Sequence, residues 1–186
     1  MSQALLIVDV QNDYFPGGRM ELVGSREAGQ QAGELLAAFR AARLPVIHVQ
    51  HVSVRPGAIF FLPGTEGIRI HDAVAPREGE PILEKNFPNA FRQTGLLAHL
   101  QGLGVRHLTI AGMMTHMCID TTVRAAFDLA FDCELAHDTC ATKALSFEGV
   151  KVPAPDVQLT FLAALDGTFA KVRSAAEIRA NLGNGR

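Results

Sequence analysis

The sequence predicts an α/β domain with a mostly parallel β-sheet. Short, continuous apolar runs rich in β-branched residues are typical of strands that are covered on both faces. These runs alternate along the chain with segments whose apolar residues recur at helical spacing, as in βαβ units. A chain of 186 residues with 48% hydrophobic content is long enough to bury one core of its own, so we expect one globular domain.

The strands are predicted from their apolar runs. Residues 4–8 end at Asp9, residues 45–49 are similar, and residues 105–111 end at Gly112. Weaker runs predict three further short strands, at 81–84, 133–136 and 170–172. Because parallel strands all end at the same edge, residues that directly follow them are expected to meet there.

The helices are predicted from spacing and capping residues. Ser25 can cap a helix over 25–43, which turns Leu35, Leu36 and Phe39 inward. Thr115 can cap a helix over 115–131 in the same way. Shorter helices are expected at 96–100, 157–164 and 175–181.

A long connection, residues 53–81, is rich in Pro and Gly and carries Arg55, Phe60 and Phe61. Loops of this length inside compact domains often act as lids or binding loops. We therefore expect it to border a ligand site.

Charge and composition exclude several classes of protein. The formal net charge is −2 and there is no basic stripe, which argues against a nucleic-acid partner. No apolar run is long enough to span a bilayer, and we expect no membrane association and no signal peptide. The three cysteines are odd in number and lack CxxC spacing, so a disulfide framework or structural zinc site is not expected. A cytoplasmic protein with a free, reactive thiol is the natural interpretation.

Three chemically active residues follow predicted strands: Asp9, Lys85 and Cys118. Cys118 would lie in the first turn of the helix after Gly112, where free N–H groups and the helix dipole lower a thiol pKa and can receive an oxyanion. Each residue has an ordinary alternative: a capping aspartate, a solvated lysine and a buried cysteine. Asp13 competes with Asp9 as the candidate acid.

Together the three side chains form a chemical unit. A carboxylate can take the thiol proton, an ammonium can stabilise the thiolate, and the thiolate can attack a carbonyl carbon. The coincidence of all three at one sheet edge favours a nucleophilic cysteine hydrolase.

The motifs that carry these residues resemble the isochorismatase-like cysteine hydrolases. The matching segments are residues 9–15, Glu84-Lys85, residues 112–118, Pro63-Gly64-Thr65 and residues 87–91. The resemblance runs through nearly the whole chain and implies a single isochorismatase-like hydrolase domain over residues 1–186. It implies a three-layer α/β/α sandwich, similar to a Rossmann fold, with a six-stranded sheet.

The resemblance also implies the roles of particular residues. Asp9, Lys85 and Cys118 would be the catalytic triad, and the peptide bond Met113–Met114 would be cis. The backbone amides of Met114 and Cys118 would form the oxyanion hole. Relatives commonly form homo-oligomers and build part of the pocket from a neighbour, so a dimer or tetramer is expected.

Within this family, the residues favour a hydrolase of C–N bonds other than peptide bonds. True isochorismatases cleave a vinyl ether without a cysteine nucleophile, so Cys118 disfavours that activity. Nicotinamidases carry an Asp-x-His metal pair where this chain has His51-Val52-Ser53, which disfavours nicotinamidase activity and zinc. His48 and His51 are a poor zinc pair and are better explained by hydrogen bonding, so no metal or cofactor is expected.

An amide, lactam, carbamate or ureide of a small molecule is therefore the expected substrate class, cleaved through a thioester on Cys118. Residues 113–118 resemble the cysteine motif of streptothricin-hydrolase-like members. A catalytically inactive interaction protein of the same fold remains an alternative.

Several residues are candidates for the substrate pocket. Aromatic side chains could wall an apolar cavity or simply pack in the core, Arg55 could meet a substrate carboxylate or be solvated, and His116 could touch substrate or lie exposed. These candidates are Tyr14, Phe15, Arg55, Phe60, Phe87, Phe91 and His116.

Overall fold

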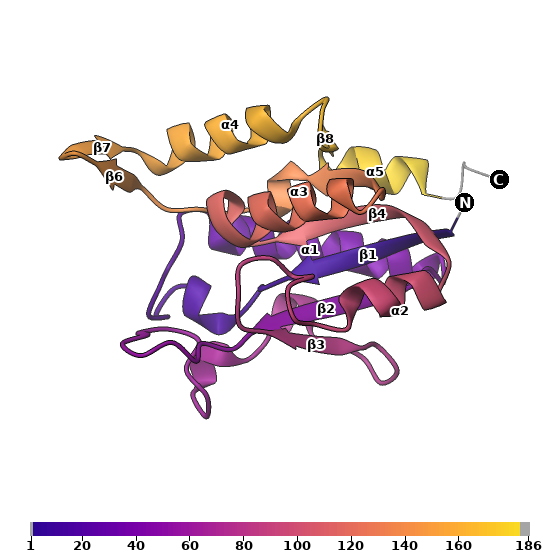
Figure 1. Cartoon of the computed structure of the whole chain (residues 1–186), viewed down its shortest axis with the longest axis horizontal. Coiled ribbons are helices and arrows are strands. Elements are labelled where there is room, and N and C mark those ends of the chain that lie inside the picture. Colours follow the sequence, from indigo (N-terminus) through magenta and orange to yellow (C-terminus); the bar gives the residue numbers. More distant parts are fainter. Residues whose placement is uncertain (1, 183–186) are drawn as a thin grey trace.

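A computed structural model describes residues 2–182 and contains a central parallel sheet between layers of helices (Figure 1). The sheet has six strands in the order β3-β2-β1-β4-β5-β8, and every neighbouring pair is parallel. The strands are β1 Ser2–Val8, β2 Val46–His51, β3 Ile82–Lys85, β4 Val105–Gly112, β5 Asp132–Ala136 and β8 Lys171–Arg173. The predicted fold class and the six-stranded sheet are confirmed.

Strand β1 lies inside the sheet, and its side chains from Ala4 to Val8 are buried on both faces. It pairs with β2 on one side and with β4 on the other. The strand order reverses at this point, and the carboxyl ends of β1 and β4 lie side by side, with Val8 opposite Gly112. Ligands of open α/β sheets bind at such a switch point.

In residues 2–182, five α-helices cover the two faces of the sheet (Figure 1). Helices α1 and α5 contribute Leu35, Phe39 and Ile178 to one apolar core, and α2, α3 and α4 contribute Leu96, Val123 and other residues to the second. Burial of these apolar stripes is what holds each helix on the sheet. The helices are α1 Ser25–Ala41, α2 Leu96–Gly102, α3 Asp120–Asp128, α4 Ala154–Leu165 and α5 Ala175–Asn181.

The predicted helix caps are wrong in both cases. Helix α1 is preceded by Gly24, with φ 76°, and Ser25 is already helical. The predicted 115–131 helix is divided into a π-helical turn, Thr115–Ile119, and α3. Thr115 does not cap it, because its hydroxyl donates to Gln158 Oε1 at 2.6 Å and lies 3.2 Å from Ala141 O.

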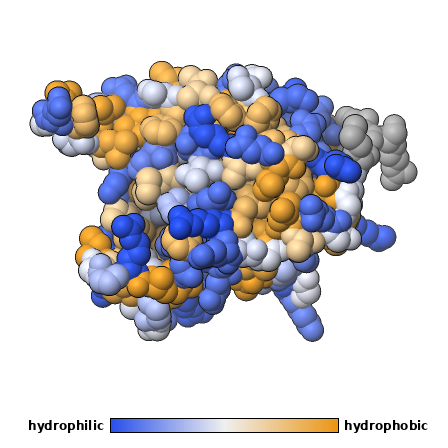
Figure 2. Space-filling model, in the orientation of Figure 1, coloured by the Kyte–Doolittle hydropathy of each residue, from blue (hydrophilic) through white to orange (hydrophobic). Residues whose placement is uncertain are grey.

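A hairpin that was not predicted from the sequence, β6 Leu145–Phe147 with β7 Val150–Val152, projects from the body of the molecule (Figure 1). Apolar side chains are exposed on this hairpin and on α4, among them Phe147, Val150 and Leu159 (Figure 2). The homo-oligomer stays a prediction. No helix within residues 2–182 has the length and apolarity needed to cross a membrane.

Gly112 is required where β4 ends against β1. Its φ of 134° is in a region that L side chains rarely adopt, and a Cβ built there would lie 2.0 Å from the Val8 carbonyl oxygen. Only glycine allows the two backbones to approach this closely. The same approach places the chain that follows β4 beside the end of β1.

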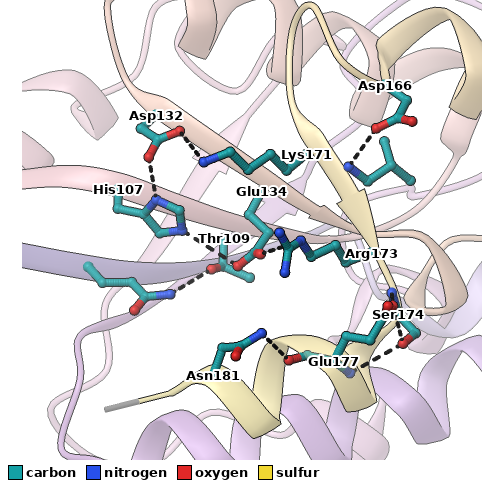
Figure 3. Close-up of polar contacts among 12 residues, drawn as sticks. His107, Thr109, Asp132, Glu134, Asp166, Lys171, Arg173, Ser174, Glu177 and Asn181 are labelled. Atoms are coloured by element: carbon teal, nitrogen blue, oxygen red, sulfur yellow. Dashed lines mark hydrogen bonds and ion pairs between the residues drawn. The ribbon is translucent and has the colours of Figure 1, made fainter. Parts of the chain in front are cut away.

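A cluster of charged side chains joins β4, β5 and β8, near the start of β4 and β5 (Figure 3). The His107 ring lies between Asp132 Oδ2, at 3.0 Å from Nδ1, and Glu134 Oε2, at 3.5 Å from Nε2. The hydrogen bond to Glu134, aided by Asp132, raises the His107 pKa despite partial burial. Arg173 lies 3.6 Å from Glu134, so the cluster ties the edge strand β8 to the sheet.

Candidate active site

The three residues predicted to act together converge at the carboxyl end of the sheet. Asp9 directly follows β1, Lys85 is the last residue of β3, and Cys118 lies in the π-helical turn after β4. The Lys85 Nζ atom is 2.6 Å from Asp9 Oδ2 and 3.3 Å from Cys118 Sγ. All three side chains are buried, so these contacts are screened little by solvent.

A fourth residue, His51, completes the surroundings of the lysine. His51 ends β2 and stands opposite Lys85 in the sheet register, and its Nδ1 atom is 2.9 Å from Lys85 Nζ. An ammonium has three N–H donors. Here the ammonium forms an ion pair with Asp9 and lies within hydrogen-bond distance of His51 Nδ1 and Cys118 Sγ.

The protonation states follow from these contacts. Burial, aided by the Lys85 charge, lowers the pKa of His51 to about 4, so the imidazole is neutral and accepts a bond from the ammonium. Burial alone would lower the pKa of Lys85, but Asp9 and then Cys118 raise it above its usual value. The lysine is therefore charged across the physiological range.

The pKa of the Cys118 thiol is shifted in the opposite direction to the one predicted from the sequence. Burial raises its pKa well above the usual value, and the Asp9 carboxylate raises it further, against the lowering effect of Lys85. The lowered pKa expected from the helix terminus is wrong, because loss of hydration and a nearby anion both favour the neutral thiol. The resting side chain is a protonated thiol beside a carboxylate.

The Asp9 carboxylate lies beside that thiol. Its backbone has φ 54°, and its side chain is completely buried. Within residues 2–182 neither carboxylate oxygen accepts a hydrogen bond of good geometry, although Oδ2 forms the ion pair with Lys85. A carboxylate oxygen of Asp9 and the sulfur of Cys118 lie within 4.8 Å of each other.

The backbone before Cys118 contains one N–H group with no hydrogen-bond acceptor among the described residues. The Met113–Met114 peptide bond is cis. The amides on either side of Met114 are bonded, Met113 N–H to Val8 O and Thr115 N–H to Ala141 O. No acceptor for the Met114 N–H is found among the described residues, and Met114 itself lines the adjoining cavity.

A cavity of about 770 Å³ opens over Cys118. Four of the predicted pocket residues line it: Tyr14, Arg55, Phe60 and Phe87. The long loop contributes Arg55 and Phe60, as expected from its length and composition. Sequence reasoning missed other lining residues, among them His51, Ser53, Asn86, Arg92 and Met117.

Three predicted pocket residues lie elsewhere. Phe15 is buried and stacks on His71, with ring centroids 3.6 Å apart. Phe91 packs against the core beside Phe131. The His116 ring contacts the Thr142 hydroxyl and is not among the residues that line the cavity. Sequence position placed these residues near the site, but side-chain direction takes them away from it.

Asp13, the competing acid, has a structural role. It is buried, and its carboxylate accepts hydrogen bonds from the backbone N–H groups of Phe61, at 2.6 Å, and Arg19, at 3.1 Å. Phe61 belongs to the long loop, so Asp13 fixes that loop against the end of β1.

The donor atoms of Asp9, His51 and Cys118 lie within 4.8 Å of one another, a spacing that a metal ion could bridge. The Lys85 ammonium, however, lies within 3.3 Å of a donor atom on each of them. A cationic group of the chain therefore already fills this place, and the residues do not fit a resident metal. His48 and His51 are not a pair either, because residues three apart on a strand point to opposite faces, and His48 contacts Glu80.

Comparison with known proteins agrees with the geometry of this site. The isochorismatase domain model matches residues 3–177. The chain belongs to the isochorismatase family. The resemblance inferred from the cysteine motif is therefore confirmed.

Individual members of the family match over nearly the full chain. The uncharacterised isochorismatase family protein YddQ of Bacillus subtilis is 47% identical over 174 residues, which cover 94% of this chain and 97% of that protein. A solved candidate isochorismatase hydrolase from Oleispira antarctica is also 47% identical, with a TM-score of 0.93 and 96% of each chain covered. A streptothricin hydrolase of Streptomyces noursei is 35% identical over 170 residues, 91% of this chain and 58% of that enzyme.

Proposed function

We propose that this member of the isochorismatase family is a hydrolase that cleaves a C–N bond, other than a peptide bond, in a small molecule. The observation that carries the proposal is the buried contact of one ammonium with a carboxylate and a thiol, Lys85 with Asp9 and Cys118, at the base of a cavity. The similarity to an enzyme named as a streptothricin hydrolase supports the hydrolase class.

The first half of the reaction transfers one proton and forms one bond. Asp9 accepts the thiol proton as Cys118 Sγ attacks the carbonyl carbon, so no free thiolate has to accumulate. This order suits a thiol whose pKa is raised in the resting protein. The Lys85 ammonium stays charged and offsets the negative charge that moves between sulfur and carboxylate.

The tetrahedral oxyanion then needs hydrogen-bond donors. The unbonded Met114 N–H is one, and the Cys118 N–H is the second donor that the family resemblance implies. Removing one such donor typically costs about 2.7–4 kcal/mol of transition-state stabilisation.

The second half releases nitrogen and restores the thiol. Protonated Asp9 gives its proton to the leaving nitrogen as the C–N bond breaks, which leaves a thioester on Cys118. Water then attacks the thioester while Asp9 accepts its proton. Return of that proton to sulfur releases the acid and regenerates the thiol.

The proposal is tested by measuring turnover of a panel of small amides, lactams, carbamates and ureides. Wild type is compared with Cys118→Ser, and Cys133→Ala serves as the matched control because that thiol is buried in the core away from the cavity. We expect wild type and the control to hydrolyse at least one compound and Cys118→Ser to lose that activity. Equal turnover by Cys118→Ser would contradict the mechanism.

A further inference from the structure

Two arginines line the cavity over Cys118, Arg55 from the long loop and Arg92 from the segment after β3. None of the residues between 2 and 182 that line this cavity is an aspartate or glutamate. The rest of the lining is mainly apolar and aromatic, and includes Tyr14, Phe60, Phe87, Met114 and Met117.

The Arg92 guanidinium is oriented but has no acidic partner among the described residues. Its central carbon lies 3.7 Å from the centroid of the Phe87 ring, a stacking contact that holds the plane of the group. Within the described part of the chain no carboxylate lies within ion-pair distance of Arg92, whereas Arg40 and Arg124 pair with Glu80 and Asp120. Its N–H donors are left for another molecule.

The charges around the cavity do not cancel. Asp9 and Lys85 neutralise each other, and neutral His51 adds nothing at physiological pH. The two guanidiniums therefore give the cavity a positive charge, although the whole chain carries a formal net charge of −2. A cleft that is lined by charges of one sign and has apolar walls raises the local concentration of oppositely charged ligands.

From this placement we propose that the substrate is an amide-type compound that also bears a carboxylate, separated from the scissile carbonyl by an apolar body. The carboxylate binds Arg92, with Arg55 beside it, while the carbonyl lies at Cys118. This inference rests on the proposed function and adds the charge of the substrate to it.

The chemistry of the groups supports this arrangement. A guanidinium presents a rigid fork of donors that matches a carboxylate bidentately, and stacking on Phe87 orders that fork before the ligand arrives. Arg92 is exposed to solvent, so the contribution is expected at the lower end for a charged hydrogen bond, about tenfold in affinity. The aromatic and methionine side chains would contact the apolar body between the two ends.

The test compares matched substrates in which one end is either a carboxylate or a second carboxamide: terephthalamate with terephthalamide, and succinamate with succinamide, with the rate of each diamide divided by its two equivalent amides. The variants are Arg92→Gln and, as a control, Arg106→Gln, because Arg106 is exposed near the start of β4, at the opposite end of that strand from the cysteine turn. Terephthalate binding is measured by calorimetry in parallel, so that recognition of the carboxylate is read independently of turnover.

We expect wild type and Arg106→Gln to prefer the charged member of a pair by about tenfold in kcat/KM and to bind terephthalate. Arg92→Gln should lose that preference and bind terephthalate about tenfold more weakly. Equal use of both members by wild type, or an unchanged preference in Arg92→Gln, would overturn the inference while leaving the hydrolase intact. Terephthalate binding that depends on Arg92, without hydrolysis of any amide, would instead count against the proposed reaction.

Discussion

Replacement of Asp9 by asparagine is expected to make Cys118 more reactive toward alkylating agents and at the same time to abolish hydrolysis. The two effects oppose each other because the proposed mechanism gives Asp9 two roles. As an anion next to the sulfur it raises the thiol pKa, and as a base it accepts the thiol proton during attack.

The size of the first effect can be worked from the geometry. A carboxylate oxygen of Asp9 lies within 4.8 Å of Cys118 Sγ, and two unit charges at that distance repel by about 3.5 kcal/mol at an effective dielectric constant of about 20. That energy corresponds to roughly 300-fold in the thiolate population. Loss of the base lowers turnover by about 100- to 10,000-fold.

The assay is alkylation by iodoacetamide at neutral pH, with Cys118 identified by peptide mass spectrometry. Glu84→Gln is the matched control, since it removes a carboxylate from the residue next to Lys85, on an exposed side chain. We expect the control to alkylate at the wild-type rate. If Asp9→Asn alkylated more slowly than wild type, Asp9 would not be raising the thiol pKa, and the assignment of charges would be refuted.

Three further changes have defined outcomes. Gly112→Ala places a methyl group against Val8 O, so the melting temperature should fall by several degrees or the protein should not fold. The pKa of His107 is raised, so its ion pairs stabilise the fold fully below pH ~6.5 and are lost as the pH rises through the raised pKa. The difference in free energy of unfolding between wild type and His107→Gln should therefore shrink as the pH rises through that range. His51→Ala removes an acceptor from the Lys85 ammonium, and kcat should fall by about tenfold with little change in KM.

Each of these has its own control. The control for Gly112→Ala is Gly104→Ala, because Gly104 also has a positive φ but a Cβ built there meets no atom within 4 Å. This substitution should lower the free energy of unfolding by only about 1 kcal/mol. For His107, the free energy of unfolding of wild type and of His107→Gln is measured by denaturant titration across the pH range. A difference between the two proteins that grows as pH rises would contradict the prediction. For His51, His51→Asn keeps a hydrogen-bond acceptor and should recover part of the rate; no recovery would argue for a different role.

The fold was predictable where local pattern and burial agree. The apolar run at residues 4–8 became β1, and the spacing at 175–181 became α5. The hairpin Leu145–Phe147 with Val150–Val152 was missed because each of its strands has only three residues, which is too short for the alternation of apolar and polar residues to indicate a strand. Ser25 was misassigned as a cap because Gly24 takes the left-handed conformation before the helix.

The residues that meet at the candidate site could be predicted from the sequence, but the protonation state of the Cys118 thiol could not. Strand ends indicated Asp9, Lys85 and Cys118 because parallel topology brings them to one edge. The direction of the thiol pKa depends on burial and on a neighbour more than a hundred residues away, which a sequence does not state. His51 carried a signal that was not used: it ends the strand next to Lys85 and therefore lies at the same edge.

The most direct test of the mechanism is mass spectrometry of the protein after rapid acid quenching with a compound that it hydrolyses. The mechanism predicts an added acyl mass on the peptide that contains Cys118, formed and consumed during turnover and absent from Cys118→Ala. Full hydrolysis by Cys118→Ala, or turnover by wild type with the acyl group on another residue, would contradict nucleophilic attack by this sulfur.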